Sequence, residues 1–157
     1  MKKLKQITLL FIVIAFITSS SCKKYPDGPL LSLHSKEHRI VGTWIVDYYS
    51  INGYDSTSYL QSQLYYGKYI FYSKKSSTPN LFLFESNIYC TSGHWKFTNN
   101  KKDLSIDQTN GCSPLPQFNT TPYTASEVNW EIRRLTDADL WLKTNYNGKE
   151  YFMKLKH

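Results

Sequence analysis

The chain has 157 residues, with 19 lysines and arginines against 12 aspartates and glutamates, and a formal net charge of +7. This length suits one domain with room for a sizeable core. The basic residues are scattered along the chain instead of forming a stripe, which argues against nucleic-acid binding. Aromatic residues make up 16% of the chain. Because aromatic side chains suit pleated, half-buried surfaces, this content favours an all-β fold.

The N-terminus has the layout of a secretory signal. Lys2, Lys3 and Lys5 precede an apolar run of 11 residues, ITLLFIVIAFI, which ends before Thr18. The run is about half as long as the roughly 20 residues that a membrane-spanning helix needs. Basic, apolar and small-residue zones in this order are typical of export signals. We therefore predict a signal peptide over residues 1–21. A buried core helix is the alternative, but the run has no polar face.

The small residues before Cys22 resemble the bacterial lipobox, with Ser20 and Ser21 in the small positions. The resemblance implies that Cys22 carries diacylglycerol and becomes the first mature residue. The mature charge would then be +4, because three of the 19 basic residues precede Cys22. Each buried lipid methylene contributes about 0.8 kcal/mol to membrane binding. An ordinary signal peptide without lipid is the alternative, because Ser19 stands where leucine is usual.

Residues 22–39 are expected to be a flexible tether between the lipid and a folded domain. Proline and glycine interrupt this segment, which has no apolar periodicity. From residue 40 to residue 157, apolar and polar residues alternate, which predicts strands. The expected strands cover residues 40–50, 68–73, 81–86, 93–98, 103–107, 127–135, 139–144 and 149–156.

The strands and turns predict an all-β fold, an up-and-down antiparallel β-barrel of about eight strands. Asn52-Gly53 and Asn147-Gly148 are strong turn signals. One short helix is expected after the first strand, over residues 55–64, and an irregular segment over residues 108–126. Closure into a barrel removes the sheet edges at which separate molecules pair. About eight strands enclose room for side chains or for one small ligand.

Three cysteines leave one without a partner in an exported chain. If Cys22 carries lipid, Cys90 and Cys112 remain as a pair in an oxidising compartment. A disulfide between them would close a loop of about 22 residues and contribute roughly 3 kcal/mol in the chain-entropy model. Two free buried thiols are the alternative.

Short motifs follow one another along nearly the whole chain. They are Cys22-Lys23-Lys24-Tyr25, Gly28-Pro29, Ser32-Leu33, Ser35-Lys36, Arg39, Gly42-Thr43-Trp44, Gly53-x-Asp55, Gly93-x-Trp95-x-Phe97, Leu135-x3-Asp139-Leu140-Trp141-Leu142 and a lysine-rich closing strand. In this order they resemble the lipocalin-like lipoproteins of Bacteroidota-type Gram-negative bacteria. The resemblance implies a small calycin-like β-barrel, exported and held on the outer membrane by its lipid. We expect it on the periplasmic face, with the cell surface as the alternative.

Patterns typical of catalytic and metal sites are missing from the sequence. It contains no G-x-S-x-G elbow and no glycine-rich phosphate loop. His34 and His38 have i, i+4 spacing, but their segment brings no further metal ligand. We therefore expect no metal, no cofactor and no enzymatic activity.

Aromatic residues provide the candidate ligand site. Tyr69, Trp95 and Trp130 are expected to point into the barrel, and strand alternation allows Glu85 to do the same. Together they would line a concave, mainly apolar pocket for a small apolar ligand. Ordinary core packing is the alternative for the rings, and a position at the barrel rim is the alternative for Glu85.

Two hypotheses of function follow. The first is a lipid-anchored binding protein whose barrel holds a small apolar ligand. The second is a non-catalytic structural or interaction lipoprotein, whose loops contact another envelope component. The first requires an internal cavity of roughly a few hundred cubic ångströms. The second requires a filled barrel, packed by Trp44, Tyr69, Trp95 and Trp130.

Overall fold

The computed structural model describes residues 25–29, 33–62, 66–73, 80–86, 90–111, 122 and 127–157. The elements within them are α2 (Lys36–Ile40), β1 (Gly42–Ile51), β2 (Tyr54–Asp55), α3 (Thr57–Ser62), β3 (Lys68–Phe71), β4 (Leu81–Glu85), β5 (Cys90–Thr98), η1 (Asn99–Lys101), β6 (Asp103–Gly111), β7 (Glu127–Leu135), β8 (Asp139–Tyr146) and β9 (Lys149–Lys156). Across these residues, the helices are all too short or too polar to span a bilayer.

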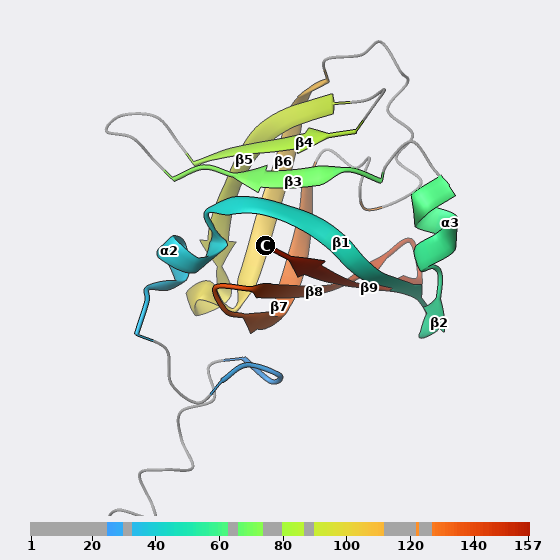
Figure 1. The fold of residues 1–157 in the computed structure, drawn as a ribbon, viewed down its shortest axis with the longest axis horizontal. Coiled ribbons are helices and arrows are strands. Elements are labelled where there is room, and N and C mark those ends of the chain that lie inside the picture. The colour runs from blue at the N-terminus through green and yellow to red at the C-terminus, as the bar shows by residue number, and fades with distance from the viewer. Residues whose placement is uncertain are drawn as a thin grey trace, which may run out of the picture.

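The strands form a closed antiparallel barrel (Figure 1). Each barrel strand pairs with the next one along the chain, and β1 also pairs with β9, which closes the ring. The two-residue strand β2 adds to the end of β1. The prediction of an eight-stranded up-and-down barrel is confirmed, with β2 as one strand more.

Bulges curve the barrel and change which residues face its interior. The register shifts after Val46 in β1, after Ser92 in β5 and after Ile132 in β7. An extra residue in one strand increases the local twist and bends the sheet. The shift in β1 turns Tyr49 inward, where it is 1% exposed, although strict alternation with Trp44 predicts the opposite face.

Inward-facing side chains from all the barrel strands form one core. Full burial of a large apolar side chain contributes about 1.5–3 kcal/mol. The buried apolar residues of these strands are Trp44, Val46, Tyr49, Tyr69, Phe71, Phe82, Phe84, Trp95, Leu104, Ile106, Val128, Trp130, Ile132, Leu135, Leu140, Leu142, Tyr151, Met153 and Leu155.

Residues 25–29 lie against the barrel, although we expected a flexible tether there. The Tyr25 side chain is buried, and its hydroxyl donates to the carbonyl oxygen of Lys101 at 3.0 Å. Burial also raises the pKa of this hydroxyl. The backbone N–H of Asp27 donates to the carbonyl oxygen of Arg133 at 2.9 Å. The Tyr25 ring, backbone hydrogen bonds and contacts of Arg133 and Arg134 with Asp27 hold the segment. Such contacts leave no periodic pattern in a sequence.

Helix α2 packs onto the barrel as well, on the side opposite α3 (Figure 1). Ile40 is fully buried, and its carbonyl oxygen accepts a hydrogen bond from Trp44 Nε1 at 2.8 Å. The buried Arg39 donates to the carbonyl oxygen of Leu135. We placed the start of the folded domain at residue 40, but these contacts show that it begins earlier in the chain. Long polar side chains that bury their apolar stems hide this helix from pattern reading.

The helix expected after the first strand is present as α3. Asp55 Oδ1 accepts from the backbone N–H of Thr57 at 2.9 Å, and this bond lowers the pKa of the Asp55 carboxyl. Leu60 is buried in the core. The described helix is shorter than the predicted range of 55–64, and residues 63–65 lie outside the described residues.

Strands β5 and β6 are longer than we expected. The sequence predicts strands over residues 93–98 and 103–107, whereas β5 begins at Cys90 and β6 ends at Gly111. Residues 108–111 are polar or glycine, so they lack the apolar alternation that identifies a half-buried strand. Backbone pairing with β5 extends the strand all the same.

Candidate functional site

Three of the four predicted ligand-binding residues lie inside the barrel. Tyr69, Trp95 and Trp130 are 6%, 3% and 3% exposed. Trp95 Nε1 donates to the carbonyl oxygen of Tyr72 at 3.0 Å, which satisfies its polar atom. The inward orientation that we predicted for these three side chains is confirmed.

Aromatic rings pack against one another across this part of the interior. Ring centroids are 4.9 Å apart between Tyr69 and Phe84, 5.3 Å between Phe71 and Phe82, and 6.0 Å between Phe71 and Trp95. Tilted and edge-to-face pairs at such distances are favourable beyond the area that they bury. These rings belong to the neighbouring strands β3, β4 and β5 and line one part of the barrel interior.

The Tyr69 hydroxyl is a buried polar group in this part of the interior. It is buried and has no hydrogen-bond partner among the described residues. Burial raises its pKa, and the nearby Tyr49 adds to the shift. A buried hydroxyl without a partner costs about 1–3 kcal/mol. A small polar molecule or an ordered water is the kind of group that removes this cost.

Glu85 faces outward and does not belong to this interior. In β4 the buried positions are Phe82 and Phe84, whereas Leu81 and Glu85 are exposed. Both faces of this strand carry large apolar residues, so alternation alone does not show which face points inward. Glu85 instead lines a surface pocket of about 380 Å³ together with Ile45, Tyr66, Gly67, Lys68 and Ser86.

The outside of the barrel carries an aromatic cluster that we did not predict. We call Tyr48, Trp141 and Phe152 with Lys154 and Arg134 the outer aromatic stripe. Lys154 Nζ lies 4.5 Å from the Trp141 ring centroid and 5.2 Å from that of Tyr48. Phe152 is 6.2 Å from both rings, and the Arg134 guanidinium carbon is 5.3 Å from Trp141. The stripe brings cations and apolar rings together on one face.

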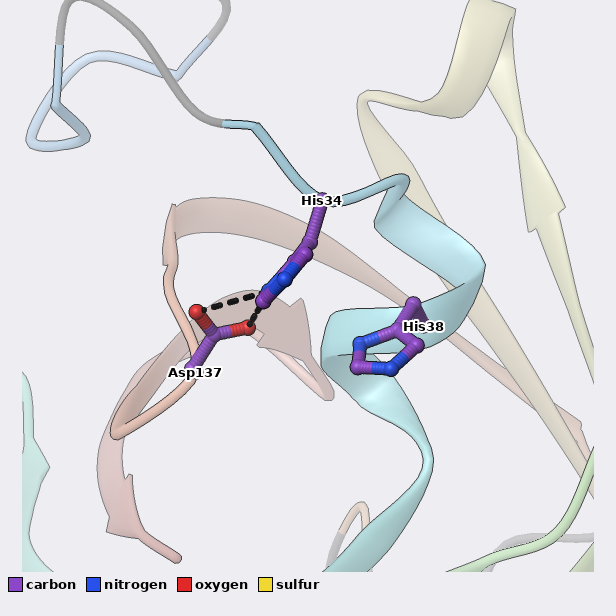
Figure 2. A group of neighbouring side chains, drawn as sticks. All are labelled: His34, His38 and Asp137. Atoms are coloured by element: carbon purple, nitrogen blue, oxygen red, sulfur yellow. Dashed lines mark hydrogen bonds and ion pairs between the residues drawn. The ribbon is translucent and has the colours of Figure 1, made fainter.

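A cluster of three metal-ligand-type side chains lies beside α2 (Figure 2). His34 Nδ1 is 3.1 Å from each carboxylate oxygen of Asp137, and the His34 and His38 ring centroids are 4.6 Å apart. All three side chains are exposed, and one ligand atom from each lies within 4.8 Å of the others. We expected no further ligand beside the two histidines. Asp137, which lies 103 positions after His34 in the chain, supplies a third possible ligand.

The cysteine predictions fall partly outside the described residues, which include Cys90 but neither Cys22 nor Cys112. Lipid attachment and the disulfide therefore stay predictions.

Alkylation of the Cys22→Ala variant tests the disulfide. We expect its non-reduced form to take up no thiol label, and its reduced form to take up two. We also expect reduction to lower the free energy of unfolding by roughly 3 kcal/mol, measured by urea unfolding. Uptake of two labels without reductant would show free thiols instead.

Comparison with known proteins assigns no family. Neither a protein-family model nor a curated protein matches the chain. The fold is similar to the crystal structure of an uncharacterized protein from Bacteroides eggerthii DSM 20697, at 18% identity and a TM-score of 0.42. The alignment covers 75% of this chain and 99% of that chain. A similarity of this size carries no functional argument, so the resemblance to lipocalin-like lipoproteins stays a prediction.

Proposed function

We propose that this protein is a lipid-anchored lipoprotein of the cell envelope that contacts another envelope component with the outside of a filled barrel. The packed interior carries this proposal. Trp44, Tyr69, Trp95 and Trp130 are each at most 6% exposed. A barrel of about eight strands is just wide enough for such side chains to fill. Recognition is then left to the outer surface.

The outer aromatic stripe supports recognition by the barrel wall. Tryptophan, tyrosine and arginine are the residues most enriched among those that dominate binding at protein interfaces. Lys154 lies over three rings of the stripe, and its ammonium is the charge that a carboxylate of a partner would pair with. We propose an envelope protein with an acidic and apolar surface as the partner.

The sequence of the N-terminus supports attachment to a membrane. A lipid on Cys22 would lie three positions before Tyr25, which is buried against the barrel. Three extended residues span at most about 11 Å. The end of the barrel that contacts Tyr25 would therefore lie close to the membrane surface, and a partner on the same membrane would meet the barrel wall from the side.

Carriage of a small ligand is the second candidate function. The buried hydroxyl of Tyr69 favours it, because it has no partner among the residues that the structure describes and is the kind of group that a bound molecule satisfies. A ligand at this position has to be small, since Phe84 and Phe82 lie 4.9 and 6.2 Å from the Tyr69 ring.

Site-specific photo-cross-linking in the protein's own host tests the proposal. A photoreactive residue at position 141 is expected to cross-link the full-length protein to one envelope protein. The same residue at position 129, which is exposed on β7 outside the stripe, serves as the matched control and is expected to give no such product. Charge reversal by Lys154→Glu should remove the cross-link from position 141. Equal products from both positions, or a product that survives Lys154→Glu, would contradict the proposal.

Native mass spectrometry of the membrane-extracted protein tests the lipid anchor and the absence of a small ligand in the barrel. We expect the added mass of a lipid that is absent in Cys22→Ala, and no small molecule released on unfolding. A bare Cys22 would remove the anchor from the proposal, and a released molecule would favour ligand carriage.

A further inference from the structure

We propose that His34, His38 and Asp137 bind a divalent first-row metal ion such as Zn²⁺. Two imidazole nitrogens and one carboxylate oxygen are typical zinc ligands, and three protein ligands leave a fourth position for water. Imidazole ligands disfavour Mg²⁺ and Ca²⁺, which take oxygen ligands. The proposal rests on the described residues alone and does not depend on the proposed envelope function.

The distances in the cluster fit such an ion (Figure 2). With metal–ligand bonds of about 2.0–2.1 Å, neighbouring ligand atoms in a tetrahedral site are about 3.3 Å apart. His34 Nδ1 and the Asp137 oxygens are 3.1 Å apart. The widest ligand separation in the cluster is no more than 4.8 Å, so the cluster has to contract by at most about 1.5 Å to reach the tetrahedral value.

Helix α2 carries His38, and His34 comes directly before the N-cap of that helix. Ser35 lies between them as the N-cap of α2, and its Oγ accepts from the backbone N–H of His38 at 3.1 Å. The buried Arg39, next in the chain, ties the helix to the carbonyl oxygen of Leu135. The Ser35 cap and the Arg39 contact fix the helix backbone. The His38 side chain therefore has to reach the ion by rotation alone.

The turn between β7 and β8 holds Asp137 in the same way. Thr136 Oγ1 accepts from the backbone N–H of Asp139 at 2.8 Å and from that of Ala138 at 3.2 Å. These bonds tie down the loop that carries the carboxylate. The side chains of His34 and Asp137 are 54% and 61% exposed, so both can rotate toward an ion.

A solvated ion pair between His34 and Asp137 is the simpler explanation of the same contact. Exposed pairs of this kind contribute about 0–1 kcal/mol. An ion pair does not require His38, whose ring nevertheless lies 4.6 Å from that of His34. In the metal-bound form, the ion takes the place of the direct contact between His34 Nδ1 and Asp137, and His38 supplies the third ligand. The ion then joins α2 to the β7–β8 turn.

Titration of the full-length, chelator-treated protein with Co²⁺ and then Zn²⁺ tests the proposal. We expect one equivalent of Co²⁺ with the visible absorption of a tetrahedral site, which Zn²⁺ displaces and Mg²⁺ does not. His38→Ala and Asp137→Asn should each weaken Zn²⁺ binding by about tenfold or more. His94→Ala removes a histidine of β5, away from the cluster, and should leave binding unchanged.

Three results would overturn the proposal. One is the absence of binding at micromolar Zn²⁺, which leaves the surface ion pair as the explanation. Another is full binding by the triple variant His34→Ala, His38→Ala, Asp137→Asn, which places the ion elsewhere, for example on thiols. The third is equal weakening by His94→Ala. Circular dichroism melting curves of the variants show whether each one is folded.

Discussion

Replacement of Trp44 with alanine is expected to lower the free energy of unfolding by about 3–5 kcal/mol. Trp44 is fully buried, and its Nε1 donates to the carbonyl oxygen of Ile40 at 2.8 Å. The His157 ring packs edge-on against it, with centroids 5.1 Å apart. Truncation would leave a large cavity and an unpaired buried carbonyl at the junction of α2 and β1. Both effects destabilise the fold.

Urea unfolding followed by circular dichroism measures the Trp44 effect, and two variants serve as controls. Trp44→Phe keeps most of the ring but loses the hydrogen bond, so we expect it to lower the free energy of unfolding by less than Trp44→Ala does. Trp141→Ala removes a partly buried tryptophan from the outer aromatic stripe and should cost about 1 kcal/mol. If Trp44→Ala and Trp141→Ala lowered the free energy of unfolding equally, Trp44 would not be a major contributor to the stability of the core.

Gly93→Ala is expected to cost about 3 kcal/mol, because β5 and β6 approach closely at this residue. A Cβ atom at Gly93 would lie 1.7 Å from the carbonyl oxygen of Asp107. The atom in the way belongs to the backbone, so no side chain can rotate to relieve the contact. The two strands would have to separate at the bulge that follows Ser92.

Gly53→Ala is the matched control for Gly93→Ala. Gly53 has φ +79°, in the left-handed region, and a Cβ atom there would meet nothing within 4 Å. Only the backbone conformation opposes alanine at this turn, at a cost of about 1–2 kcal/mol. Thermal unfolding of both variants measures the difference. A Gly93→Ala variant as stable as Gly53→Ala would contradict the close approach of the strands.

Local patterns were enough to predict the regular strands. In β7, the alternation of Val128, Trp130 and Ile132 predicts the inward face, and all three are buried. The hairpin between β8 and β9 follows from Asn147-Gly148, both of which have positive φ. These features depend on neighbours along the chain, so a sequence reveals them directly.

The same patterns failed where a strand has two apolar faces or a bulge. Glu85 is exposed on β4 because Phe82 and Phe84, not Leu81, take the interior. Tyr49 is buried because the register of β1 shifts before it. Choosing between two apolar faces requires knowledge of the neighbouring strands, and a single sequence does not contain it.

By itself, the sequence determined an all-β chain with strands and turns in the right order, and predicts an export signal with a lipid site. Only the tertiary structure decided which rings face the barrel interior, that residues 25–29 and α2 pack against the barrel, and that Asp137 lies beside His34. The reason is physical. Alternation and turn residues express interactions over a few residues, whereas ring closure between β1 and β9 brings together side chains far apart in the chain, and no local pattern records such contacts.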